Sequence, residues 1–428
     1  MSSWLPISKT SPFSLQNIPF GIISIGHHEV KVPAVAVGDH VLDLNAFAAA
    51  GGFDQLSTIQ PHLHVFRQTT LNEFAALGRP HHREVRLYLQ SIFHTDTPFP
   101  GLLKDNQAVR EKALHPLSEV TNHMPLRIGD YTDFYGCMNH AVNVGTLMRG
   151  PENALQPNYK HLTVAYHGRA SSIVVSGTPI QRPNGQVLPE AEPKKPQLLP
   201  CGKLDIELEL AAFISTSNEL GKPVPLGQAE DHIFGVVLMN DWSARDIQAW
   251  EYVPLGPFNA KNFATTISPW VVLIDALESF RTPLSKPDDR NSLLPYLREE
   301  GHNGFDIHLE VELTNREGVS TIVSRTNSKN LFYSFNQMLA HHTIGGCNMK
   351  PGDLLGSGTI SGTTPRSEGS LLEQTGGKIP IRLRDGSKRF FLEDGDTVTF
   401  RGIAGTEGSY VGFGECTGTI MPAIPMEI

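Results

Sequence analysis

The stretch Lys203-Leu-Asp-Ile-Glu-Leu-Glu-Leu210 alternates strictly between apolar and acidic residues after its first position. Side chains of a β-strand point alternately to its two faces, so the apolar residues share one face and the acids the other. Neighbouring acids on one strand face repel each other unless water or a cation separates them. The stretch therefore predicts a strand whose acidic face is either solvated or bound to a cation.

A second acidic position follows the apolar run of residues 233–239, which continues into Asn240-Asp241-Trp242. Asp241 would stand at the end of a strand, where it could join Glu207 and Glu209. Hard oxygen ligands that converge in this way suit Mg²⁺ or Ca²⁺. A simpler interpretation makes Glu207 and Glu209 solvated and Asp241 the N-cap of a helix from Trp242 to about Trp250.

Composition limits the classes of function. The chain has 428 residues and a formal net charge of −9, with no basic stripe, which argues against nucleic acid and anionic membranes as partners. The four cysteines are scattered and form no C-x-x-C pair, so a zinc site is not expected. Neither a signal-peptide pattern nor a long apolar run is present, so we expect a soluble, cytoplasmic protein.

The distribution of glycine, proline and alternating segments favours β structure with many turns. Composition changes at 97–101, and we expect the polar stretch from there to 123 to connect two domains, 1–123 and 124–428. The segment 179–200 contains six prolines and is expected to be an extended surface loop.

The segment Gly129-Asp-Tyr-Thr-Asp-Phe-Tyr-Gly-Cys-Met-Asn-His140 concentrates acids, tyrosines and a histidine. Asp133 could add a carboxylate to the metal set. His140 is a candidate general base, because the ordinary pKa of histidine lies near working pH. A structural role for this histidine is the alternative.

A third polar segment follows Asp241. If a helix begins there, Arg245, Gln248 and Tyr252 share one face and could surround an anionic or diketone substrate; an amphipathic surface helix is the alternative. Lys261 and Thr265 follow on a loop of the kind that often carries function. A glycine-rich stretch, 351–364, matches no nucleotide-binding motif and contains a further candidate contact, Thr359.

Several blocks together resemble the fumarylacetoacetate hydrolase family, and the resemblance covers nearly the whole chain. The blocks are Asp130-Tyr-Thr-Asp-Phe-Tyr135, Tyr166-His-Gly-Arg-Ala-Ser-Ser-Ile-Val-Val-Ser-Gly-Thr-Pro179, Met239-Asn-Asp-Trp-Ser-Ala-Arg-Asp-Ile-Gln248, Gly256-Pro-Phe258 and Ser357-Gly-Thr-Ile-Ser-Gly362. The resemblance implies a mainly β (α+β) fold, with a small N-terminal SH3-like β-barrel and a large C-terminal β-sandwich roll, assembled as a homodimer.

The resemblance also implies a metal-dependent hydrolase that cleaves the C–C bond of 4-fumarylacetoacetate in the last step of tyrosine and phenylalanine breakdown. It implies Mg²⁺ or Ca²⁺ held by Asp133, Glu207, Glu209 and Asp241, with Lys261 and Thr265 bordering a cation site. His140 would be the base, oriented by Glu373, and Arg245, Gln248 and Lys261 would face the oxyanion. Substrate contacts would come from Tyr135, Arg149, Tyr166, Gln248, Tyr252 and Thr359. One departure is Ala264, where the family has glycine.

Two other functions compete. Acylpyruvate hydrolases, oxaloacetate decarboxylases and 2-keto-enoate hydratases share the implied metal site but lack the N-terminal domain. A β-sandwich binding module with a structural Ca²⁺ would need no base, which would leave His140 without a task.

Overall fold

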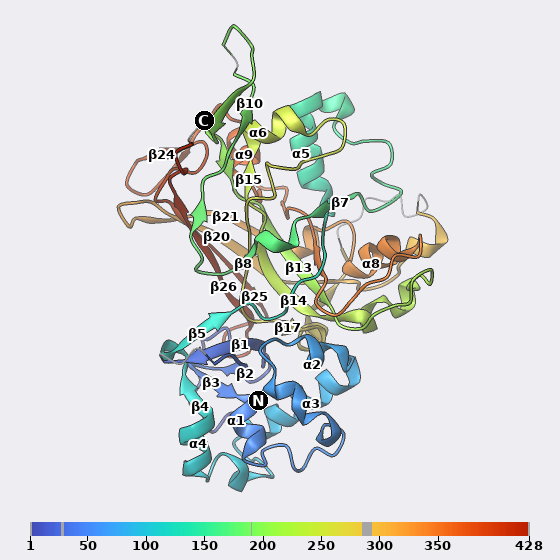
Figure 1. The fold of residues 1–428 in the computed structure, drawn as a ribbon, viewed down its shortest axis with the longest axis vertical. Coiled ribbons are helices and arrows are strands. Elements are labelled where there is room, and N and C mark those ends of the chain that lie inside the picture. The colour runs from blue at the N-terminus through green and yellow to red at the C-terminus, as the bar shows by residue number, and fades with distance from the viewer. Residues whose placement is uncertain (1, 27–29, 190, 285–292, 427–428) are drawn as a thin grey trace.

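The computed structural model describes residues 2–26, 30–189, 191–284 and 293–426. These residues form a smaller N-terminal part and a larger C-terminal part that lies above it in Figure 1. Sheets dominate both parts and helices cover their faces, so the predicted α+β class is confirmed.

The smaller part is built on a five-stranded antiparallel sheet in the order β4-β3-β2-β1-β5. Its strands are β1 (Phe20–Ile25), β2 (Val32–Val37), β3 (His40–Asp43), β4 (Leu114–Pro116) and β5 (Val120–His123). Strands β4 and β5 come from the stretch predicted to be a connection. That prediction was wrong, because both strands pair with the sheet of the smaller part.

Helices pack around this sheet. They are α1 (Leu44–Ala49), the 3-10 helix η1 (Gln60–Arg67), α2 (Asn72–Ala76), α3 (Arg79–Phe93) and α4 (Gln107–Ala113). Helix α3 buries Val85, Leu89, Ile92 and Phe93 at helical spacing, as an amphipathic helix on a core should.

The two parts share a hydrophobic core. The ring of Phe74 on α2 contacts that of Phe234 at a centroid distance of 5.9 Å, and His82 on α3 contacts the same ring at 4.8 Å. The His82 ring is buried. Its Nε2 lies 3.0 Å from the carbonyl oxygens of both Phe74 and Ala75, so its N–H has hydrogen-bond acceptors.

Charged side chains also join the two parts, in a set that we call the interdomain ion-pair network. It consists of Arg79, Glu230, Asp275, Glu278 and Arg281. Arg79 lies 2.5 Å from Glu230 and 3.2 Å from Asp275, and Arg281 lies 2.6 Å from Glu230 and 2.7 Å from Glu278. Each carboxylate therefore meets at least one arginine.

The larger part contains a mixed sheet in the order β7-β6-β22-β13-β14-β16-β8, with β17 paired to β14. Its strands are β6 (Tyr131–Phe134), β7 (Ala165–Gly168), β8 (Ile173–Val175), β13 (Leu208–Ile214), β14 (Ile233–Asn240), β16 (Thr265–Ile267), β17 (Val272–Leu273) and β22 (Leu354–Gly356). The β6–β22 and β8–β16 pairs are parallel, so residues distant in sequence meet at one end of the sheet.

A second sheet in the order β21-β20-β25-β26-β9 faces the first across a large apolar core. Its strands are β9 (Ile180–Gln181), β20 (His308–Thr314), β21 (Ser320–Asn327), β25 (Thr397–Ala404) and β26 (Val411–Met421). Four two-stranded sheets complete the part: β10 (Asn184–Val187) with β11 (Gln197–Pro200), β12 (Leu204–Asp205) with β15 (Ser243–Ala244), β18 (Arg281–Thr282) with β19 (Gly304–Phe305), and β23 (Ile381–Arg382) with β24 (Lys388–Arg389).

The prediction that the proline-rich segment 179–200 is an extended surface loop was wrong, because β10 and β11 pair within it. Helices α5 (Met138–Arg149), α6 (Arg245–Glu251) and α9 (Leu371–Thr375) lie near that hairpin at the upper end of Figure 1, while α7 (Ile274–Leu277) and α8 (Phe335–Thr343) lie elsewhere on the larger part.

Candidate active site

The acidic stretch 203–210 divides between two strands. Leu204 and Asp205 form β12, β13 begins at Leu208, and Glu207 lies between them. Glu207 is 6% exposed, and Asp205 and Glu209 are fully buried. The interpretation of a solvated acidic face was therefore wrong, and each of these carboxylates needs a buried partner.

Four carboxylates gather at one end of the large sheet, and we call them the acidic cluster. They are Asp133, Glu207, Glu209 and Asp241, all buried, with one oxygen from each within 4.8 Å of the others. Pairing of β6 with β22, β22 with β13 and β13 with β14 brings their four segments together. A Cβ on Gly356 would lie 2.5 Å from Asp133 Oδ1, so glycine there leaves room for the carboxylate.

The acidic cluster has too few cations for its charge. Lys261 Nζ lies 2.6 Å from Asp241 Oδ2 and also donates to Glu207, while the Tyr166 hydroxyl donates to Asp241 at 2.8 Å. Asp133 Oδ1 and Glu209 Oε1 are buried with no hydrogen-bond partner among the described residues. Two orphaned carboxylate oxygens beside two further carboxylates fit a hard divalent cation such as Mg²⁺ or Ca²⁺.

The pKa directions show the same imbalance. Burial raises the pKa of Asp133 and Glu209 well above their usual range, and the neighbouring carboxylates raise both further. Burial also acts to raise the pKa of Glu207, but the Lys261 and Arg245 cations hold it below its usual value. A further positive charge bound between these two acids would favour their ionised forms.

Asp241 does not cap a helix, and that prediction was wrong. Its Oδ1 accepts from the Thr265 hydroxyl at 3.2 Å, and its Oδ2 accepts from Lys261 and Tyr166. Helix α6 begins only at Arg245, after the short strand β15. The Asp241 side chain is therefore committed to the acidic cluster rather than to backbone N–H groups.

His140 on α5 pairs with Glu373 on α9. Its Nδ1 lies 2.7 Å from Glu373 Oε2, and because a carboxylate only accepts, Nδ1 carries the proton and Nε2 is left as an acceptor. Nε2 faces the acidic cluster, 3.9 Å from Glu207 Oε1. The pair thus has the geometry of an oriented general base beside a candidate metal site.

Residues that the sequence did not single out hold Glu373 in place. Asn143 donates to its Oε1 at 2.9 Å, and the hydroxyls of Ser361 and Ser370 donate to its Oε2 at 3.0 and 2.8 Å. Burial acts to raise the pKa of Glu373, but His140 and these hydrogen bonds hold it below its usual value. Sequence signals could have found two of them: Asn143 lies one helical turn from His140, and Ser370-Leu-Leu-Glu373 has capping-box spacing.

Arg245 is held by two acids and presents one free nitrogen. Its Nε donates to Asp205 at 2.8 Å, and its Nη1 donates to Glu207 at 2.8 Å and to Gln248 Oε1 at 3.1 Å. Its Nη2 is buried without a partner among the described residues. Asp205 also accepts from the backbone N–H groups of Leu371 and Leu372, so one buried carboxylate ties Arg245 to the start of helix α9, which carries Glu373.

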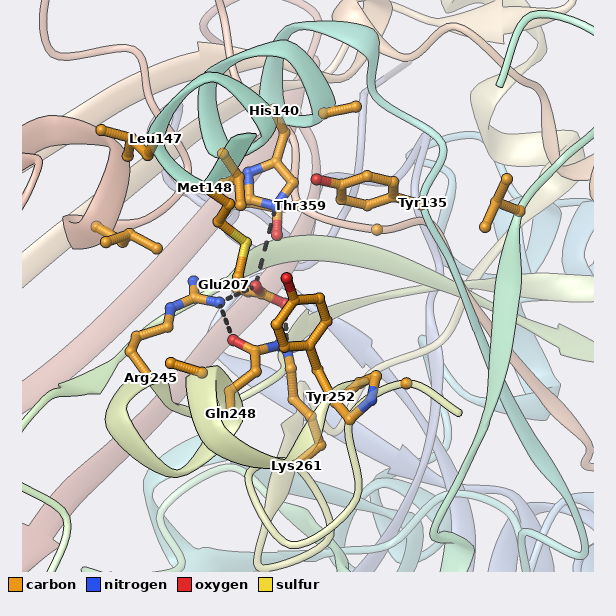
Figure 2. Close-up of a pocket in the computed structure, with 18 of the residues that line it drawn as sticks. Tyr135, His140, Leu147, Met148, Glu207, Arg245, Gln248, Tyr252, Lys261 and Thr359 are labelled. Carbon is orange, nitrogen blue, oxygen red and sulfur yellow. Dashed lines mark hydrogen bonds and ion pairs between the residues drawn. The ribbon is translucent and has the colours of Figure 1, made fainter. Parts of the chain in front are cut away.

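These groups open onto one cavity of about 810 Å³, a volume ordinary for a small-molecule site. Figure 2 shows His140, Glu207, Arg245, Gln248, Tyr252, Lys261 and Thr359 around this space. Every predicted site residue lines it except Asp241, Thr265 and Glu373, each of which contacts another member of the site.

The remaining predicted contacts occupy the cavity wall. Arg149 donates to the carbonyls of Asn153 and Ala154 at 3.0 and 2.7 Å, which fixes the end of α5 rather than leaving the guanidinium fully free. The Tyr135 ring stands edge-on to His140 at 5.3 Å, and the Thr359 hydroxyl is buried without a partner among the described residues. Leu147 and Met148 of α5 form an apolar wall that the sequence did not single out.

Comparisons with known proteins identify the family of the chain. The model described as fumarylacetoacetate (FAA) hydrolase C-terminal matches residues 131–421, and the model described as fumarylacetoacetase N-terminal matches residues 16–125. The chain is 70% identical over 430 residues to a fumarylacetoacetase of Aspergillus fumigatus, with 100% of both chains covered. It is 50% and 46% identical to the fumarylacetoacetases of Arabidopsis thaliana and Homo sapiens, with 99% of each chain covered.

A solved structure supports the fold independently. Fumarylacetoacetate hydrolase from the psychrophile Exiguobacterium antarcticum aligns with a TM-score of 0.51 at 15% identity, over 95% of this chain and 99% of that one. At that identity the likeness concerns the fold alone.

Within the described residues, no helix is long and apolar enough to cross a membrane.

Proposed function

The chain belongs to the fumarylacetoacetate hydrolase family, and from that premise we propose that it cleaves the C–C bond of 4-fumarylacetoacetate to give fumarate and acetoacetate. One observation carries the proposal: the His140–Glu373 pair and the acidic cluster open onto the same cavity. A base next to a cation site is what hydrolysis of a β-diketone requires, because the leaving group is an enolate.

The acidic cluster would hold a divalent cation, Mg²⁺ or Ca²⁺, through Asp133, Glu207, Glu209 and Asp241. When bound, the cation supplies Lewis-acid stabilisation to the enolate oxygen. Lys261 and Thr265 hold Asp241 in orientation from the side, and Tyr166 does the same through its hydroxyl. Such supporting contacts fix ligand geometry.

His140 activates the attacking water. Its unprotonated Nε2 takes the proton while Glu373, paired to Nδ1, stabilises the imidazolium that forms. The hydroxide adds to the carbonyl next to the fumaryl group, and collapse of the tetrahedral intermediate breaks the C–C bond. The acetoacetate enolate then takes the proton held by the His140 imidazolium to give the keto form of acetoacetate, and the new carboxyl group of fumarate loses its proton to solvent.

Three side chains face the oxyanion of that intermediate. Arg245 offers its unpartnered Nη2, Gln248 offers its amide nitrogen because its oxygen already accepts from Arg245, and Lys261 offers its ammonium group. Placed donors of this kind are each worth about 2.7–4 kcal/mol in lost-donor measurements. Their positions are fixed before substrate arrives, so little reorganisation opposes the reaction.

The outer cavity recognises the substrate. Tyr135, Tyr252 and Thr359 contact its body, and Arg149 at the end of α5 pairs with a terminal carboxylate. From the family resemblance of the sequence motifs, we further propose that the protein is a cytoplasmic homodimer that acts in the last step of tyrosine and phenylalanine breakdown.

The test is loss of the diketone absorbance when the purified protein is mixed with fumarylacetoacetate and, separately, with acylpyruvates. We expect fast cleavage of fumarylacetoacetate and release of fumarate. Preferential cleavage of acylpyruvates, or binding of both without turnover, would overturn the substrate assignment.

A further inference from the structure

A second hollow, separate from the catalytic cavity, lies on strand β21. Its volume is about 500 Å³, and it shares no lining residue with the catalytic cavity. Four arginines line it, namely Arg325, Arg366, Arg382 and Arg384. Four guanidinium groups around one concave surface are unexpected in a chain with a net charge of −9.

Hydrogen bonds hold the three segments that carry these arginines together. The Arg325 N–H on β21 donates to the Arg366 carbonyl at 2.9 Å, which fastens the loop 362–367 to the strand. The Arg384 N–H donates to the Thr321 hydroxyl at 3.0 Å, which fastens the β23–β24 hairpin to the same strand. The hollow is therefore part of the folded framework, with its arginines converging from three backbone segments.

Most of this positive charge has no counter-charge. Arg325 pairs with Glu310 at 2.8 Å, and Glu310 also lies 3.9 Å from Arg401. Within the residues that the structure describes, Arg366, Arg382 and Arg384 form no ion pair with a carboxylate. Like charges gathered on one surface repel each other, and an anion between them removes that cost.

Arg366 occupies an unusual backbone position. Ser367 N–H donates to the Thr364 carbonyl at 3.1 Å, which closes a turn with Pro365 second and Arg366 third, and Arg366 has a φ of +64°. Glycine fits this position without strain, and a bulky side chain there is an outlier. Strained positions cluster at ligand-binding sites, and the Arg366 guanidinium also donates to the Ile322 carbonyl inside the hollow.

We propose that this hollow binds a small multivalent oxyanion that carries two or more phosphate or carboxylate groups. Guanidinium groups bind both by paired, charge-assisted hydrogen bonds. The volume suits a small molecule rather than a macromolecule. No aromatic side chain is among the lining residues, so charge is the main feature that the hollow offers a ligand.

The experiment is titration calorimetry of the full-length protein, saturated with Mg²⁺, with fructose 1,6-bisphosphate and with tricarballylate in separate runs. We expect one ion of at least one probe to bind per chain at about 50 mM NaCl and to bind more weakly at about 500 mM. The probe that binds more tightly identifies the source of the oxyanion groups as phosphate or carboxylate.

Three variants decide where the probe binds. Arg366→Gly removes a guanidinium and relaxes the left-handed backbone, so the fold should be retained, and the double variant Arg382→Gln/Arg384→Gln changes exposed side chains only. Each should weaken binding by about tenfold or more. Arg67→Gln, an exposed arginine of the smaller part, is the matched control and should bind as the parent does. Failure of both probes to bind, or equal binding by all variants, would overturn the proposal.

Discussion

The acidic cluster and the interdomain ion-pair network use the same residue types in opposite ways. In the network, Glu230, Asp275 and Glu278 each lie within 3.2 Å of an arginine, and that matching fastens the two parts of the chain. In the cluster, four buried carboxylates share Lys261 and one edge of Arg245, and two of their oxygens have no partner in the part of the chain that the structure describes. Matched charge holds the fold, whereas unmatched buried charge marks a place for a ligand.

The largest expected effect comes from the base. His140→Ala should lower kcat by about 10²–10⁴-fold, because no other group accepts the proton from water, while binding of the divalent cation persists. Steady-state kinetics and calorimetry with Mn²⁺ measure the two properties. A kcat near that of the parent protein would end the assignment of His140 as base.

The second effect concerns Asp205, which positions Arg245 and the start of α9. Asp205→Asn should lower kcat by about tenfold to a hundredfold with a smaller change in KM, because it weakens a charge-assisted hydrogen bond to Arg245. The matched control is Asp275→Asn in the interdomain network, where kcat should be unchanged. Equal losses of kcat in both variants would reduce Asp205 to a general structural role.

The third effect is a pH dependence of stability that arises from His82, which contacts Phe234 where the two parts of the chain meet. Burial lowers the pKa of His82 from an ordinary value of 6.5 to about 4. Between pH 4 and pH 6.5, His82 is therefore protonated in the unfolded chain but not in the folded chain. The contribution of His82 to stability is full above pH 6.5 and is lost as the pH falls towards 4.

From that shift, the His82 contribution should fall by about 2 kcal/mol between pH 7 and pH 5. His82→Gln keeps an N–H donor for the Phe74 and Ala75 carbonyls but does not titrate. Urea unfolding at the two pH values should show a smaller difference for the variant than for the parent. An unchanged difference would mean that other groups set the acid sensitivity.

The smallest effect has opposite signs in the two regions. In EDTA at pH 7, Glu209→Gln should raise the free energy of unfolding, because burial and neighbouring carboxylates raise the pKa of Glu209 and oppose its ionisation. Asp275→Asn should lower the free energy of unfolding by about 1 kcal/mol, because it removes a matched partner of Arg79. Chemical denaturation measures both, and destabilisation by Glu209→Gln in EDTA would contradict the distinction.

Local sequence patterns predicted much of the acidic cluster. Alternation placed Glu207 and Glu209 on one face, and the end of an apolar run placed Asp241 beside them, since a period of two and a strand terminus are local properties. The pairing of His140 with Glu373 spans 233 positions, and only the family resemblance suggested it. Long-range pairing depends on the tertiary fold, which local periodicity does not encode.

Two of the incorrect predictions have the same cause. Asp241 has the chemistry of an N-cap, but Lys261, Tyr166 and Thr265 compete for its oxygens once the sheet forms. Strands β4 and β5 lie in a polar, charged stretch of the sequence, which indicated a connection, yet they complete the sheet edges by pairing with β3 and β1. In each case a partner distant in sequence decided the local structure.

The most direct measurement of the central claim is calorimetric titration of Mg²⁺ and Ca²⁺ into metal-stripped protein, with fumarylacetoacetate cleavage followed on the same samples. The unmatched charge of the acidic cluster predicts one ion per chain, no measurable cleavage after EDTA, and recovery of cleavage along the binding curve. Full cleavage by the stripped protein, or unaltered ion binding by Glu209→Gln, would contradict the account.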